Sequence, residues 1–178
     1  MIYKKILLRL SVLPLVLFLA VSSAAQETCA LNVENAPALF GLKLAQSPEE
    51  VQAVFGRALK IKIKKKGEKI FFQNFIKKPA PSVLAGVRAL YLRFLDRRLY
   101  QIEIFYEDRP QIETLEDFEA NLSETLNLPD ALWQRVKGKA VINCGELTIV
   151  ADKLLTPHVE LTDEPTRRKA LELREPKK

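Results

Sequence analysis

Two consecutive stretches in which apolar and polar residues alternate constrain the fold of this chain more than any other sequence feature. The first covers residues 87–94 and the second 99–106, with Asp96-Arg97-Arg98 between them. Alternation with a period of two is typical of a strand that has one buried face, and a short polar connection predicts a hairpin. An antiparallel sheet with one apolar face is therefore the expected centre of the fold.

Helices are expected before and after this hairpin. A capping box formed by Ser47 and Glu50 predicts a helix over 48–55. From Thr114 the spacing of apolar residues changes to three and four, which predicts a second helix over 114–127. Both helices are expected to pack on the sheet through an apolar edge.

Further strands are expected to extend the sheet. Residues 59–63, where lysines alternate with apolar side chains, and 70–76 form a predicted hairpin. Residues 141–150 predict another hairpin around Gly145, and 158–161 an edge strand. The sequence thus predicts an α+β fold with an antiparallel sheet of five to seven strands and two main helices.

Residues 1–25 match the pattern of a cleavable signal peptide. A basic start precedes an apolar run over 6–21 and small residues at 22–25, where cleavage is expected. The alternatives are an uncleaved membrane anchor, for which the apolar run is short, and a lipoprotein, for which the residues before Cys29 are too polar. We expect an exported protein, periplasmic or extracellular, with no transmembrane segment after signal cleavage.

Removal of the signal leaves about 150 residues, which suits one domain with a single core. We expect this α+β domain over 26–162, followed by a charged C-terminal tail over 163–178 that forms at most a short, frayed helix. Both cysteines, Cys29 and Cys144, follow the signal, and an even number of cysteines in an exported chain favours a disulfide. The alternative is two buried, unpaired thiols.

A dense run of basic residues occupies residues 57–78. One interpretation is a contact with anionic lipid, an envelope polymer or an acidic protein, and the other is a solvated strand face whose lysines protect a sheet edge from aggregation. Nucleic acid is not an expected partner, because export is predicted and Phe71, Phe72 and Phe75 are expected in the core. The candidate contacts for an anionic partner are Lys60, Lys62, Lys64, Lys65 and Lys66.

The sequence offers no recognisable catalytic set. His158 follows Pro157 without a serine or cysteine motif that would use it as a base. Glu49 and Glu50 are accounted for by helix capping. Two distant cysteines and one histidine do not make a metal-ligand cluster. We therefore expect a protein that is not an enzyme and uses no cofactor or metal.

The segment FGLKLAQSPEEVQAVFG, followed later by YLRFLDRRLYQIEIFY, is similar to the SmpA/OmlA-type, or BamE-like, domains of small outer-membrane assembly lipoproteins. The same architecture, duplicated, occurs in secreted β-lactamase inhibitor proteins. The resemblance covers about residues 39–106, with Ala45 in place of the usual glycine, no lipobox and a longer chain. It implies an α+β fold that binds proteins through its sheet, without catalytic residues to transfer.

These observations predict an exported, non-enzymatic bacterial envelope protein that binds another envelope or secreted protein or supports envelope assembly. Two alternatives are a secreted inhibitor of a hydrolase, which the inhibitor resemblance implies, and an anionic-surface binder that acts through the lysine-rich hairpin.

Overall fold

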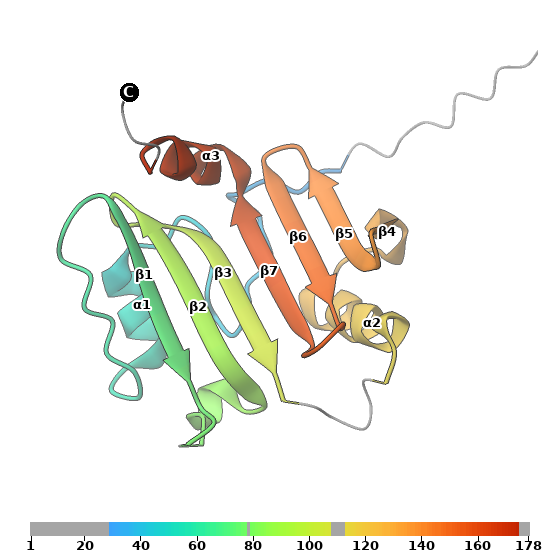
Figure 1. Ribbon diagram of the computed structural model, residues 1–178, viewed down its shortest axis with the longest axis horizontal. Helices are drawn as coiled ribbons and strands as arrows, with labels where there is room; N and C mark the ends of the chain where they lie inside the picture. Colours follow the sequence, from blue (N-terminus) through green and yellow to red (C-terminus); the bar gives the residue numbers. More distant parts are fainter. Residues whose placement is uncertain (1–28, 78, 108–112, 175–178) are drawn as a thin grey trace, which may run out of the picture.

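The computed structural model describes residues 29–77, 79–107 and 113–174 of the chain (Figure 1). These residues form one seven-stranded antiparallel sheet with three α-helices, which confirms the expected α+β class. The predicted signal peptide, residues 1–25, lies outside the described residues. In chain order the elements are α1 (Pro48–Phe55), β1 (Glu68–Asn74), β2 (Val87–Leu95), β3 (Arg98–Tyr106), α2 (Leu115–Leu126), β4 (Gln134–Val136), β5 (Lys139–Cys144), β6 (Leu147–Asp152), β7 (His158–Asp163) and α3 (Glu164–Glu172), with short 3-10 turns at Ser82–Leu84 and Asp130–Leu132.

The sheet has the strand order β1-β2-β3-β7-β6-β5-β4. Each half of the chain therefore supplies a helix followed by an antiparallel run of strands, and the halves meet where β3 pairs with β7. Helices α1 and α2 lie behind the same face of the sheet, while α3 lies across one end (Figure 1). The order of elements, a helix followed by antiparallel strands, is thus repeated in the second half of the chain.

The core lies between the sheet and this helical layer. Apolar side chains from alternate positions of the predicted hairpin, such as Leu90, Leu92 and Ile102, are completely buried there. Val51 of α1 and Phe118 of α2 reach the same core cluster. Period-two burial on the sheet and helical burial on the two helices thus agree with the pattern in the sequence.

Both predicted helix starts are confirmed. In α1 the Ser47 hydroxyl accepts a hydrogen bond from the Glu50 backbone N–H, and the Glu50 carboxylate accepts one from the Ser47 N–H at 2.7 Å. Thr114 and Asp117 form the equivalent reciprocal pair at the start of α2. These contacts satisfy backbone N–H groups that the first helical turn leaves without an intrahelical acceptor.

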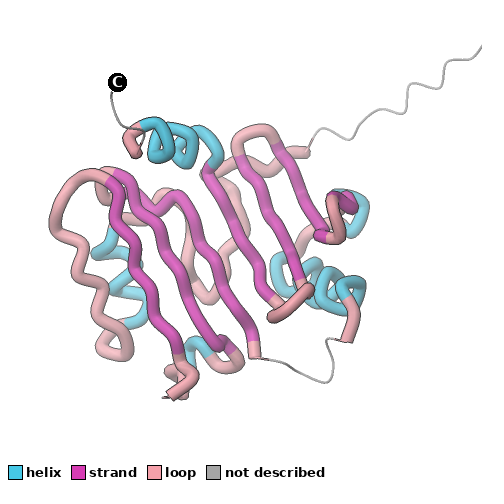
Figure 2. Tube along the Cα trace, in the orientation of Figure 1, coloured by secondary structure: helices cyan, strands magenta, loops and turns pink. Residues whose placement is uncertain are grey.

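The predicted strand over 59–63 does not form. Residues 57–67, here called the lysine segment, run beside α1 and β1 as a loop (Figure 2). The side chains of Leu59, Ile61 and Ile63 are still buried. The backbone, however, forms hydrogen bonds with side chains instead of with a neighbouring strand: the Gln52 side chain donates to the Leu59 carbonyl and accepts from the Ile61 N–H, both at 2.7 Å. The alternation predicted burial correctly, and strand pairing incorrectly.

Three further expectations need correction. Strand β7, expected at an edge, lies in the centre of the sheet between β3 and β6. A third helix, α3, occupies residues expected to form at most a frayed helix; Asp163 caps it and Ala170 is fully buried. The alternation over 99–106 predicts Tyr100 on the same face as Ile102, but a register shift between β2 and β3 places Tyr100 in a small separate cluster with Leu95 and Ala170.

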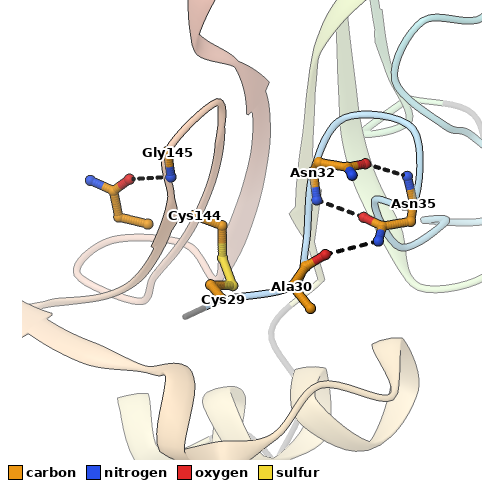
Figure 3. The surroundings of a disulfide bond; sticks show 7 residues. Cys29, Ala30, Asn32, Asn35, Cys144 and Gly145 are labelled. Carbon is orange, nitrogen blue, oxygen red and sulfur yellow. Dashed lines mark hydrogen bonds between the residues drawn. A yellow bond between two sulfur atoms is a disulfide. The ribbon is translucent and has the colours of Figure 1, made fainter. Parts of the chain in front are cut away.

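The disulfide between Cys29 and Cys144 is confirmed (Figure 3). Its two Cα atoms lie 5.3 Å apart, and the bridge joins residues separated by 115 positions. Cys144 ends β5 at the turn that includes Gly145. The bridge therefore fixes the start of the described chain to the second half of the sheet.

Candidate functional site

The sheet face opposite α1 and α2 is the candidate functional site, here called the open face. Figure 1 views the molecule onto this face, with both helices behind the strands. One row of directly paired residues crosses it through all seven strands. From β1 to β4 the row is Phe72, Tyr91, Glu103, Glu160, Val150, Val141 and Gln134.

Four rings form an aromatic ladder over four neighbouring strands. The ring centroids are 4.2 Å apart between Phe72 and Tyr91, 5.7 Å between Tyr91 and Phe105, and 4.9 Å between Phe105 and His158. These spacings are those of interacting aromatic pairs. The ladder joins both halves of the sheet with one aromatic surface.

Phe72 corrects the expectation that the three phenylalanines of this region lie in the core. Phe75 is buried and Phe71 packs against the core, but Phe72 is 48% exposed. Adjacent residues of a strand point to opposite faces, so Phe71 and Phe72 cannot both be buried against the helices.

A hollow of about 230 Å³ lies beside the ladder and includes Phe72, Tyr91 and Phe105 in its walls. Ile76 borders it and is 65% exposed, and Ile70 on the same face of β1 is 52% exposed. Large apolar side chains grouped on one uncovered surface are typical of interaction sites.

Glu103 and Glu160 lie directly opposite each other where the two halves of the sheet meet, and are here called the glutamate pair. Burial raises the pKa of the Glu103 carboxyl above its usual value, and the neighbouring Glu160 raises this pKa further. Glu160 accepts a hydrogen bond from the Thr162 hydroxyl at 2.8 Å. Among the described residues, Glu103 has no hydrogen bond or ion pair through its carboxylate.

Two other titratable groups of this face, Lys139 and His158, have structural contacts. Lys139 forms an ion pair with Asp152 at 2.8 Å. His158 stacks on Phe105, and its Nδ1 lies 3.2 Å from the Thr156 carbonyl oxygen. No group of three or more potential metal ligands occurs in the described part of the chain.

The five lysines predicted as anionic contacts lie elsewhere, on the lysine segment. All five are exposed, and none forms an ion pair with another described residue. Burial of Leu59, Ile61 and Ile63 turns Lys60, Lys62 and Lys64 outward. The structure therefore separates a basic segment, beside α1, from the aromatic and acidic open face.

Sequence reasoning did not identify the glutamate pair or the ladder as a site. The alternation within residues 99–106 marks Glu103 and Phe105 as polar-face positions, but it carries no information about which strand pairs with β3. That partner, β7, is more than fifty residues away, so the glutamate pair and the Phe105–His158 contact arise from topology.

Comparison with known proteins found no matching family model, no matching curated protein and no matching solved structure. Within the described residues, no helix has the length and apolar character needed to cross a membrane.

Proposed function

We propose that this chain is an exported, non-enzymatic envelope protein that binds another protein through its open face. The observation that carries the proposal is the aromatic ladder, which continues into an exposed apolar surface at Ile70 and Ile76. Aromatic side chains supply much of the binding energy in protein interfaces because they bury a large area with few rotatable bonds.

Other features support export and the protein-binding role. The Cys29–Cys144 bridge is typical of an oxidising compartment, and residues 1–25 have the pattern of a signal peptide. A helix followed by antiparallel strands occurs twice in the chain, and a duplicated architecture of this kind is what the resemblance to secreted inhibitor proteins implies.

Site-specific photocrosslinking in an envelope extract tests the proposal. A benzophenone side chain at Ile70 reports on the open face, and one at exposed Glu124 on α2 is the control for the opposite side. We expect a discrete crosslinked protein from position 70 only, with lower yield after Phe72→Ala. The same products from both positions, or none from position 70, would contradict binding at this face. Capture of a hydrolase would favour the alternative that this protein is a secreted inhibitor of a hydrolase.

A second candidate function is binding to an anionic surface through the lysine segment. It is favoured by five exposed lysines without ion-pair partners among the described residues. Such side chains attract anionic lipid or polymer, each contributing about 1 kcal/mol near a charged membrane at low salt.

Binding to vesicles that contain phosphatidylglycerol tests this second function. Replacing Lys62, Lys64 and Lys65 by glutamine should weaken binding by roughly fivefold per lysine and reduce its salt dependence. The matched control replaces the exposed Lys43, Lys137 and Lys169. Equal losses in both variants would indicate net charge rather than a site on the lysine segment.

A further inference from the structure

We propose that the glutamate pair binds a lysine or arginine side chain of the partner protein, presented next to an apolar residue that packs on the aromatic ladder. This inference rests on the proposed function and adds the chemistry of the partner. Its basis is the row across the open face, in which Glu103 and Glu160 separate two aromatic residues from two valines.

The glutamate pair is unfavourable for the isolated protein. Like charges directly opposite on neighbouring strands destabilise a sheet, and burial of part of Glu103 adds to this effect. Thr162 donates a hydrogen bond to Glu160, whereas Glu103 has no such contact within the described residues. A cation placed between the two carboxylates would offset both effects.

None of the protein's own described cations forms an ion pair with Glu103 or Glu160. Lys139 is engaged by Asp152, and His158 stacks on Phe105. His158, Arg93 and Lys139 all act on Glu103 electrostatically and lower its pKa, but burial and Glu160 outweigh them, so the pKa stays above its usual value. Arg93 lies one row away, where it is paired with Gln101. A partner can therefore supply a positive charge closer to the glutamate pair than the protein's own cations.

The surroundings identify the kind of cation. Tyr91 is paired with Glu103, and Phe105 is two residues further along the same strand, on the same face. A lysine or arginine side chain can pack its apolar stem on such rings, with its charged end near the carboxylates, and gains a cation–π attraction. The hollow beside Phe72 and Tyr91 accepts an adjoining apolar side chain.

NMR titration of the isotope-labelled protein with short blocked peptides tests this inference. The probes are Gly-Trp-Arg-Gly, Gly-Trp-Gln-Gly and Gly-Trp-Glu-Gly, which differ only in charge beside the tryptophan. We expect the arginine peptide to shift the amide signals of Tyr91, Glu103, Phe105 and Glu160, and to bind at least fivefold more tightly than the glutamine peptide. The glutamate peptide should bind most weakly.

The variant Glu103→Gln/Glu160→Gln should bind the arginine and glutamine peptides equally, while Glu113→Gln/Glu124→Gln, at exposed positions, should keep the preference. Equal binding of all three peptides to the open face of the unmodified protein would overturn the inference and leave the proposed function standing. Absence of any shift on this face would also overturn the inference. Failure of crosslinking at Ile70 would remove the proposed function as well.

Discussion

Glu103 illustrates how one residue can carry a cost for stability that its sequence position does not reveal. Its carboxyl is partly buried and lies opposite Glu160, where β3 pairs with β7, and both effects raise its pKa. A carboxyl whose pKa is raised in the folded state favours folding when it is protonated. That contribution is present below the ordinary carboxyl pKa and is lost as pH rises through the folded-state value.

Glu103→Gln should therefore stabilise the protein at pH 7, by about 0.5 kcal/mol, because it removes a like-charge contact. The gain should vanish near pH 4, below the raised pKa of Glu103, where the native glutamate is already largely protonated. Urea unfolding at the two pH values measures the difference, with Glu113→Gln as an exposed control. A destabilised variant at pH 7 would mean that the Glu103 charge has a favourable partner in solution.

A second residue-scale contact joins β1, β3 and the end of α3. The Tyr100 hydroxyl donates to Glu68 at 2.6 Å, and Arg174 forms a bidentate pair with the same carboxylate. The Arg174 hydrogen bond lowers the pKa of Glu68, while burial and the Glu68 contact raise the pKa of Tyr100 to about 12. The hydrogen bond between Tyr100 and Glu68 is thus maintained at pH values above the Glu68 pKa and is lost as the Tyr100 hydroxyl ionises.

Spectrophotometric titration of tyrosine should detect this ionisation. We expect a component near pH 12 in the native protein that Tyr100→Phe removes, because Tyr100 is stabilised in its neutral form. Glu68→Gln should move the same component to lower pH, since it removes the negative charge beside the hydroxyl. A titration that neither substitution changes would contradict the contact.

At the scale of elements, a helix or strand is predicted correctly when the contacts that form it lie close together in the sequence. The capping boxes of α1 and α2 involve residues three positions apart, so the sequence predicts both helix starts. Residues 59–63 of the lysine segment are predicted as a strand because alternation reports burial alone. Its backbone partners include Gln52 and Arg97, whose side chains replace a neighbouring strand.

Gln52→Ala should release the lysine segment from α1. Loss of its hydrogen bonds to Leu59 and Ile61 should lower the free energy of unfolding by about 1–3 kcal/mol, since it leaves partly buried backbone groups unsatisfied. Trypsin cleavage after Lys60, Lys62 and Lys64 measures the local effect and should become faster. The control is Gln134→Ala, at an exposed position of β4, which should change neither quantity.

At the scale of the whole molecule, the sequence predicted the class of fold and the apolar face of the sheet. It did not predict that β7 lies beside β3, because pairing between the last strands of the two halves depends on contacts remote in sequence. The open face follows from that pairing: without it, Glu103 and Glu160 would not meet, and the aromatic ladder would end at Phe105.

The disulfide is the covalent link between the beginning of the described chain and the second half of this sheet. Because it closes a loop of 115 residues that contains both α1 and α2, it restricts the unfolded chain strongly. Reduction should therefore lower stability by about 2–4 kcal/mol and the Tm by on the order of 10 °C. Thermal unfolding with and without dithiothreitol measures this loss. Cys29→Ala/Cys144→Ala should unfold at the lower temperature in both conditions, and a native protein indifferent to dithiothreitol would show that the bridge contributes no net stability.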